Sequence, residues 1–464
     1  MNKIIGIILS KKFWWTIFIL SLIGWTTLFI LKFFLIGYKT WDIGAHIQAI
    51  FNLSLHSNYF SNFIGMHHLA DHFWPGLALF VPFLKIWANP FWFLLAKLIA
   101  YFACPIILLY ISKKHFKNKK LVYLLPLLWL INDPLINVLS AQNISTALTM
   151  PFIILSFYFA YIRKYYWMFF SLIFLSLFKE YMPQIWLCVG TYIFIEQKRH
   201  KMGLLTIICG LLIGFGMNFY SIPFFRYGLE SLHNNNFAPF QFIGLKFLMV
   251  LKALLSIGLI PLLLPRYLLY IIPAFGVYLM TNKINVFFLV DHYHDLTMAT
   301  IFAVSFLVLL KYQNNKTWFN NWKSKSKQRL FVVIILILFI NSMPKNPFKK
   351  IANLTKNFRN KYSIYKSVQQ FKKELPLTTE IWADEYLTFY FLEYANIQSF
   401  DQYHFPKFNF ERKNNYFIII PVKKYSLLRA DLYDQFKLKI SSMRNIKELS
   451  DNKLLKIYRI ETKQ

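Results

Sequence analysis

Long apolar runs recur along most of the chain, and short polar or basic segments separate them. The runs lie near residues 13–36, 91–112, 121–139, 146–162, 166–178, 180–196, 202–222, 246–263, 266–281, 296–311 and 330–343. Backbone groups in lipid must form their hydrogen bonds within the chain, so the runs are predicted to be helices that span a membrane. The first run is too long for the core of a signal peptide, and we interpret it as an uncleaved span. The pattern as a whole predicts about eleven spans.

The segment 74–88 is ambiguous, because it is short and contains Pro75, Pro82 and Lys85. Four basic clusters decide its interpretation, since positively charged loops are retained in the cytoplasm. They lie at residues 113–120, 162–166, 196–201 and 323–329. All four are cytoplasmic only if 74–88 does not cross, which makes this segment a re-entrant or interfacial helix. The N-terminus is then predicted inside and the C-terminus outside.

The chain is predicted to have two domains, a transmembrane domain at 1–343 and a soluble extracytoplasmic domain at 344–464. Its first outer loop, 37–90, is expected to carry interfacial helices. After about residue 345 the composition becomes charged and water-soluble. The stretch "YSIYKSVQQFKKEL" has a helical period, whereas "EIWAD", "YFIIIPV" and "LLKIYRI" are typical of short strands. The predicted fold class is therefore a polytopic α-helical membrane protein with a small extracytoplasmic α/β domain.

Composition narrows the function classes. The chain is 57% hydrophobic and 20% aromatic, and its formal net charge is +32. Much of that charge lies in clusters between apolar runs, so it indicates membrane topology rather than nucleic-acid binding. The three cysteines all fall within apolar runs, which argues against a disulfide framework or a cysteine metal site. The sequence has no P-loop, no Rossmann glycine pattern and no HExxH motif, so a nucleotide-driven pump is not expected.

Two polar clusters occupy the first outer loop. In "WDIGAHIQAIF", Asp42 is either a carboxylate held at the membrane surface as a base or metal ligand, or the N-cap of an interfacial helix. In "HHLADH", His68 and His72 could share a helical face and bind a metal with Asp71 nearby. The alternative is a polar loop satisfied by water and backbone groups. Spacing alone favours the structural interpretation of both clusters.

Three further clusters are predicted on the same outer face. "FKEYMP" places Lys179 and Glu180 at the rim between two apolar runs, as functional groups or as a mutual ion pair. "FFRYG" contributes Arg226, whose guanidinium can donate two parallel hydrogen bonds to phosphate or anchor the chain at the interface. "VDHYHDL" carries His292 and His294 immediately before a run, as phosphate donors or as residues of a helix-start loop. Five clusters on one face indicate a site.

Several stretches, in order along the chain, resemble the predicted bacterial membrane-protein family known as domain of unknown function 2079. They are "YKTWDIGAHIQAIFN", "LADHFWPGLALFVPFLKIW", "LFKEYMPQIWLCVGTYIF", "RYGLESL" and "DHYHDLTMATIFAV". That family looks like a branch of the GT-C glycosyltransferase superfamily, which resembles protein O-mannosyltransferases and aminoarabinose transferases in layout. The resemblance implies a polyprenyl-phosphate-linked sugar as donor, an extracytoplasmic glycan or lipid as acceptor, and a multi-pass location in the bacterial inner membrane.

The resemblance also implies roles for single residues. Asp42 corresponds to the catalytic aspartate of the first outer loop, and Asp71 and Glu180 join it as catalytic candidates. The donor phosphate would be bound by cationic or hydrogen-bonding side chains. The resemblance offers Lys179, Arg226 and His292 for this role, and the H-x-H spacing adds His294. A divalent metal bridged by Asp42, Asp71 and His72 is left open, and no other cofactor is expected. One small departure is Ala70, where a glycine is common in the family.

The favoured hypothesis is a GT-C-type glycosyltransferase. A transporter or flippase for a lipid-linked precursor is a rival, and it predicts polar residues at mid-membrane depth. The centres of the apolar runs carry few charges, whereas the polar clusters gather outside, which favours the enzyme. A third alternative is a non-catalytic envelope assembly protein with this fold.

Overall fold

The structure is a computed structural model that describes residues 7–38, 44–119, 121–141, 146–226, 238–282, 284–289, 294–313, 345–400, 415–424, 426, 430–443, 445–449 and 453–461. The chain divides into two compact units. The first comprises residues 1–26, 69–76 and 95–349, and the second comprises residues 27–68, 77–94 and 350–464.

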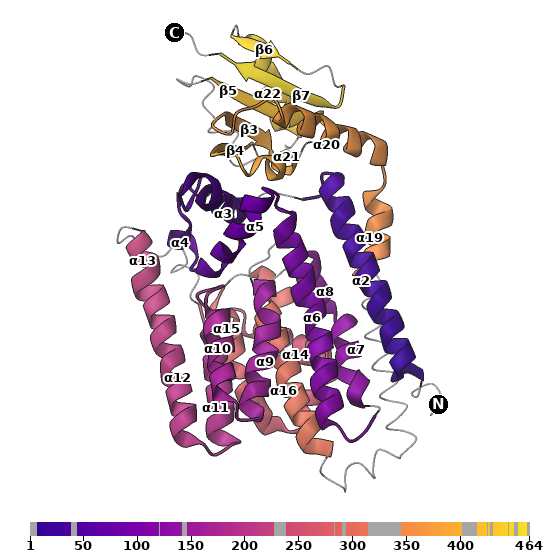
Figure 1. The fold of residues 1–464 in the computed structure, drawn as a ribbon, viewed down its shortest axis with the longest axis vertical. Coiled ribbons are helices and arrows are strands. Elements are labelled where there is room, and N and C mark those ends of the chain that lie inside the picture. The colour runs from indigo at the N-terminus through magenta and orange to yellow at the C-terminus, as the bar shows by residue number, and fades with distance from the viewer. Residues whose placement is uncertain are drawn as a thin grey trace. The chain divides into compact units, whose positions relative to one another are not determined.

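The first unit is a bundle of apolar helices that run alongside one another (Figure 1). The helices that lie wholly or largely within it are α2 (Lys11–Phe34), α4 (His68–Asp71), α6 (Phe91–His115), α7 (Leu124–Leu130), α8 (Asp133–Ser140), α9 (Met150–Tyr161), α10 (Tyr165–Ser176), α11 (Gln184–Ile195), α12 (His200–Phe215), α13 (Ile222–Phe225), α14 (Ile243–Leu255), α15 (Ile272–Met280) and α16 (Asp295–Gln313). A π-helical turn, Gly216–Ser221, joins α12 to α13. Helix α19 (Pro347–Leu354) continues into the second unit.

Helix α16 forms the centre of this bundle, because every residue from Asp295 to Leu310 is buried. Helices α9 and α8 pack against it. Beside it, α11 and α12 form a tight hairpin in which glycine permits close contact. A Cβ atom at Gly203 would lie 2.7 Å from the backbone nitrogen of Phe194, so only glycine fits there without a shift of the backbone. Small residues at such contacts let helix backbones approach closely.

The membrane spans follow from length and composition. Among the described residues, four helical segments are long and apolar enough to cross a membrane: Lys11–Phe34, Phe91–His115, His200–Phe225 and Asp295–Gln313. Two further helical segments, Leu121–Leu130 and Asp133–Ser140, are bent by 45° relative to each other. If they form one broken span, the number of candidate spans rises to five. The other apolar helices are shorter, and the predicted run 330–343 lies outside the described residues. The predicted count of about eleven spans is therefore not confirmed.

The second unit contains the first loop and the C-terminal part of the chain. The loop forms α3 (Gly44–His56), the short strands β1 (Phe60–Ser61) and β2 (Met66–His67), the 3₁₀ turn η1 (Pro75–Phe80) and α5 (Val81–Ile86). The first two residues of η1 belong to the first unit. On α3, Ile47, Ile50 and Phe51 are buried. On the same helix, Gln48 donates to the backbone oxygen of Ile397 at 3.4 Å, and its side-chain oxygen accepts the Asn62 backbone N–H at 2.9 Å. The first bond ties the loop to β4 (Asn396–Phe400) of the C-terminal sheet, and the second holds the loop's own backbone.

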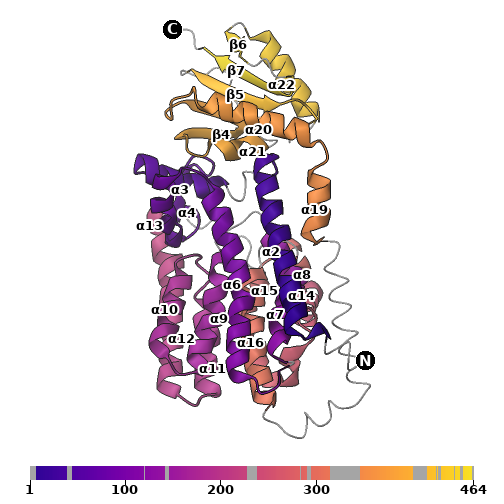
Figure 2. The same cartoon turned by 45° about the vertical axis from the view of Figure 1, so that its right-hand side comes forward.

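The C-terminal part is the predicted α/β domain (Figure 2). Its five-stranded sheet has the order β4-β3-β5-β7-β6. The strands are β3 (Glu380–Asp384), β4 (Asn396–Phe400), β5 (Tyr416–Pro421), β6 (Ile446–Glu448) and β7 (Leu455–Ile460), and the helices are α20 (Phe358–Lys372), α21 (Glu385–Thr388) and α22 (Ala430–Ser442). Strands β4, β3 and β5 are parallel, whereas β7 is antiparallel to β5 and β6. Leu432, Phe436 and Ile440 of α22 pack on one face of the sheet.

Candidate functional site

Two segments distant in sequence meet in the first unit. One follows α4 and carries Asp71 and His72, and the other is the turn between α10 and α11 that carries Lys179 and Glu180. Gly76 joins them, because its backbone N–H donates to the Leu177 carbonyl at 2.8 Å. A Cβ atom at Gly76 would lie 3.0 Å from that same oxygen, so a larger residue would push the two segments apart.

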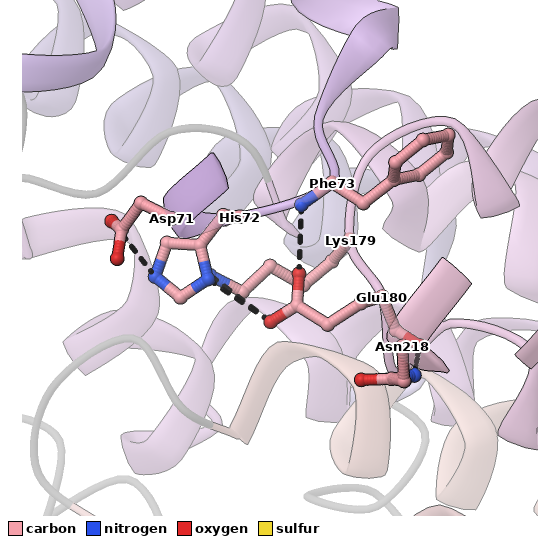
Figure 3. Close-up of polar contacts among 6 residues, drawn as sticks. All are labelled: Asp71, His72, Phe73, Lys179, Glu180 and Asn218. Carbon is pink, nitrogen blue, oxygen red and sulfur yellow. Dashed lines mark hydrogen bonds and ion pairs between the residues drawn. The ribbon is translucent and has the colours of Figure 1, made fainter. Parts of the chain in front are cut away.

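The imidazole of His72 lies between two carboxylates (Figure 3). Its Nδ1 is 3.0 Å from Oε1 of Glu180, and its Nε2 is 3.6 Å from Oδ2 of Asp71. The other oxygen of Glu180 accepts the backbone N–H of Phe73 at 3.3 Å. The three side chains are 14% to 18% exposed, so the array is largely shielded yet reachable from outside.

Lys179 is fixed beside this array by an aromatic ring. Its Nζ lies 3.9 Å from the ring centroid of Trp74 and 3.9 Å from Oε1 of Glu180. Trp74 also stacks on His72, with ring centroids 5.1 Å apart and planes 9° apart. An ammonium over an indole face gains a cation–π attraction that strengthens when water is excluded. The ring therefore positions both the lysine and the imidazole.

The electrostatics of the cluster keep Glu180 ionised. Burial raises the pKa of this carboxyl group, but Lys179 and His72 outweigh burial and hold its pKa well below the usual range. The His72 hydrogen bond and a backbone bond act in the same direction. A carboxylate that accepts several hydrogen bonds beside a cation favours its charged form. Glu180 is thus an acceptor for an N–H or O–H donor at neutral pH.

Two buried charged residues of the first unit were not among the site candidates from the sequence. Lys97 of α6 is 1% exposed, and Asp295 at the start of α16 is fully buried. The charges of Lys97 and Lys179 both act on the Asp295 carboxylate. A lysine alone in an apolar helix was the available signal, because ionisable groups at membrane depth are functional candidates. Lys97 is also an exception to the expectation that the spans carry little charge.

The remaining candidates are placed as follows. His294 is 1% exposed, and its Nε2 lies 2.6 Å from the Val286 carbonyl oxygen. Arg226 is 8% exposed and follows α13 directly. Asp42 and His292 lie outside the described residues. The structure thus brings Asp71, His72, Lys179 and Glu180 into contact, and the roles of all the candidates stay predictions.

The residues described around His72 do not fit a metal site. Both of its ring nitrogens face carboxylates, so a metal ion would have to displace Asp71 or Glu180 from the ring. Within the described part of the chain, no group of three or more His, Cys, Asp and Glu residues is arranged to hold a metal ion. The shared helical face expected for His68 and His72 is not formed, because α4 ends at Asp71.

Comparisons with known proteins give distant solved structures and one family. One such structure is that of ArnT from Cupriavidus metallidurans bound to undecaprenyl phosphate; the two chains are 10% identical. The match covers 97% of this chain and 98% of that one with a TM-score of 0.48, a likeness too distant to assign a fold or a ligand. No curated protein matches. The family profile of the predicted membrane proteins DUF2079 matches residues 32–387. The protein belongs to this family.

Proposed function

We propose that the protein is a GT-C-type membrane glycosyltransferase that moves a sugar from a polyprenyl-phosphate donor to an extracytoplasmic glycan or lipid acceptor. The observation that carries the proposal is the cluster of Asp71, His72, Lys179 and Glu180 within a bundle of apolar helices. Membership of a family of membrane proteins supports it. The positive-inside pattern supports a cytoplasmic N-terminus, with the cluster and the C-terminal domain outside.

The chemistry requires one bond to form and one to break. The acceptor hydroxyl oxygen attacks the anomeric carbon of the sugar, and the bond from that carbon to the phosphate oxygen breaks. The acceptor proton passes to a carboxylate base, for which Asp42 is the candidate from the family resemblance. Asp71 and Glu180 hold His72 between them, and this array relays or stabilises the transferred proton.

The departing phosphate needs positive charge. The Lys179 ammonium, fixed over Trp74, supplies it next to the carboxylate array, and Arg226, His292 and His294 are further candidates. A fixed cation in a site shielded from water stabilises developing negative charge more strongly than water does. A donor with a long isoprenoid tail suits a groove between spans that opens sideways to lipid.

The test uses a cell in which the gene is deleted and replaced by wild type, Glu180→Gln or Lys179→Met. Mass spectrometry of lipid extracts and of envelope glycans measures the donor and the product, with the abundance of each variant checked by immunoblot. We expect the deletion and both variants to accumulate the polyprenyl-phosphate sugar and to lose one glycan modification. The matched control is Glu196→Gln, whose carboxylate pairs with Arg266 and Lys311 at the opposite end of α16.

Two results would contradict the proposal. If lipids and glycans are the same in deletion and wild type, the protein does not transfer a sugar under these conditions. If purified protein carries labelled lipid-phosphate sugar across vesicles and transfers none, the protein is a transporter.

A further inference from the structure

A polar cavity of about 270 Å³ opens at one end of the five-stranded sheet in the second unit. Its lining comes from places where strands begin or end: residues 378–380 lead into β3, Asn396 begins β4, Asn415 precedes β5, and Arg459 is the last but one residue of β7. These ends meet because β4, β3 and β5 are parallel, whereas β7 is antiparallel to β5. The cavity is smaller than the roughly 300–1,000 Å³ of sites for drug-sized ligands, so it suits one small ring.

The cavity offers hydrogen-bond donors and acceptors side by side. Among the described residues, the hydroxyl groups of Thr378 and Thr379 have no hydrogen-bond partner in the protein, and each can donate and accept. The Asn396 side chain is oriented by its Nδ2, which donates to the Thr378 carbonyl oxygen at 3.3 Å. Its side-chain oxygen and second N–H remain available to a ligand. The adjacent hydroxyl groups of a sugar, which also donate and accept, match this lining.

The charges of the lining are balanced, which disfavours an ionic ligand. The charged side chains among the lining residues are those of Glu380 and Arg459. Arg459 Nε lies 3.3 Å from Oε1 of Glu461, an exposed carboxylate that is not part of the lining. Glu380 Oε1 accepts the indole N–H of Trp382 at 3.0 Å, which holds the carboxylate in place. An anion such as phosphate would meet Glu380 and a cation would meet Arg459, whereas a neutral polar ligand avoids both repulsions.

Phe417 supplies an apolar surface within the polar lining. It lies opposite Arg459 in the antiparallel pairing of β5 with β7, so both side chains are on the same face of the sheet. Phe371 of α20 supports the half-buried ring through an edge contact, with centroids 5.6 Å apart and planes at 66°. A pyranose ring has C–H groups on its faces and hydroxyl groups at its rim. It therefore matches a phenyl ring that is surrounded by hydroxyl and amide groups.

We propose that this cavity binds one neutral hexose or N-acetylhexosamine unit of a glycan. Phe417 packs against the face of the sugar ring, while Thr378, Thr379 and Asn396 bind its hydroxyl groups. This binding is noncovalent and requires no sugar transfer. A second step rests on the proposed function: the bound unit belongs to the acceptor, so the acceptor is a neutral glycan bound by the C-terminal domain.

The test measures sugar binding by the full-length protein in lipid nanodiscs, because glycoside detergents would compete for the cavity. Saturation-transfer NMR follows titrations with glucose, galactose, mannose and N-acetylglucosamine. We expect at least one of these sugars to bind with a Kd on the order of 1 mM. Asn396→Ala and Phe417→Leu should each weaken that binding about fivefold, because a hydrogen bond or the ring contact is lost.

Lys423→Gln is the matched control in the same domain. Lys423 lies just beyond the opposite end of β5 and pairs with the exposed carboxylate of Asp434, so this variant should bind sugar as wild type does. Asn396 is exposed and Phe417→Leu keeps an apolar side chain, so thermal unfolding of both variants should stay close to that of wild type.

Three results would overturn the proposal. They are that none of the four sugars binds, that Asn396→Ala or Phe417→Leu binds as wild type does, or that inorganic phosphate binds in place of sugar and Arg459→Gln abolishes this binding. Donor turnover is measured separately. If a sugar binds as expected but the protein transfers none, the cavity is a sugar site and the proposed function is wrong. If the protein transfers sugar but none binds to the cavity, only the cavity proposal is wrong.

Discussion

Glu180→Gln changes stability in a way that depends on pH. The carboxylate lies 3.0 Å from His72 Nδ1 and 3.9 Å from Lys179 Nζ, and both partners are largely buried. The attraction to Lys179 alone is about 4 kcal/mol at 3.9 Å if the effective dielectric constant is about 20. Desolvation opposes this attraction, and glutamine keeps one acceptor oxygen. We therefore expect the variant to be less stable by about 2 kcal/mol at pH 7.

The pH dependence has a definite sign. Because the folded-state pKa of Glu180 lies well below its usual range, its contribution is fully present above the unfolded pKa, about 4.3. It is lost as the pH falls below that value towards the folded pKa. The stability difference between wild type and Glu180→Gln should therefore shrink by about 1.4 kcal/mol per pH unit below about pH 4.3.

The assay is denaturant unfolding of the full-length protein in micelles, followed by tryptophan fluorescence from pH 7 to pH 3. Carboxylates common to both proteins cancel in the difference. Glu448→Gln is the matched control, since Glu448 forms an exposed pair with Lys456, and such pairs contribute about 0–1 kcal/mol. A difference between wild type and Glu180→Gln that stays constant down to pH 3 would refute the assignment of an ionised, charge-paired Glu180.

Three further predictions concern packing, capping and the phosphate site. Gly203→Ala should destabilise the protein by about 1–3 kcal/mol, because the new Cβ would lie 2.7 Å from the Phe194 backbone nitrogen. A Cβ atom at Gly216 would meet nothing within 4 Å, so Gly216→Ala should leave stability unchanged. Equal effects of the two variants on thermal unfolding would contradict the close packing of α11 on α12. Asn132→Ala should lower the free energy of unfolding by about 2–3 kcal/mol in the same measurement. The Asn132 side chain caps α8 by accepting the Leu135 backbone N–H at 3.1 Å, and it donates to Ser256 Oγ at 3.0 Å. A decrease of less than about 0.5 kcal/mol would show that neither hydrogen bond contributes to stability. Arg226→Gln should weaken binding of undecaprenyl phosphate about tenfold in a titration followed by native mass spectrometry, because the charged hydrogen bonds to phosphate are lost. The control is Arg266→Gln, which breaks an exposed ion pair with Glu196 and should leave binding unchanged. If Arg226→Gln binds as wild type does, Arg226 is not part of the phosphate site.

The sequence predicted the C-terminal elements best where the side-chain pattern was regular. Strands β3, β5 and β7 coincide with the apolar or alternating stretches that predicted them. Strands β4 and β6 were missed because their patterns are weak: β4 has polar residues at Asn396, Gln398 and Ser399, and β6 has only three residues. Their pairing with β3 and β7 is determined by tertiary contacts that no local pattern records.

Span prediction was weaker because hydropathy does not register breaks in the helix. The run 246–263 ends as α14 at Leu255, where Gly258 and Leu259 adopt positive φ angles. Two short 3₁₀ turns, Ile260–Leu263 and Pro265–Tyr270, then replace a continued helix, and each has a proline in its first two positions. Proline lacks the N–H that an α-helix interior needs, and left-handed residues end a helix. An apolar run is therefore not by itself one span.

The candidate site could be predicted in part. Topology placed both "LADHF" and "FKEYM" on one face, but the contact between His72 and Glu180 joins residues 108 positions apart. That contact depends on Gly76 and on the stacking of His72 on Trp74, which only the folded chain shows. Lys97 and Asp295 were not among the site candidates, because each looks structural when considered alone.

The most direct test of the account is donor turnover by the purified protein. Full-length protein is reconstituted with lipid extract and envelope acceptor from the deletion strain, and mass spectrometry follows the polyprenyl-phosphate sugar over time. We expect wild type to consume the donor, release polyprenyl phosphate and transfer the sugar to the acceptor, whereas Glu180→Gln and Lys179→Met should do so at least tenfold more slowly. Donor that persists unchanged with folded wild type, or equal turnover by Glu180→Gln, would contradict it.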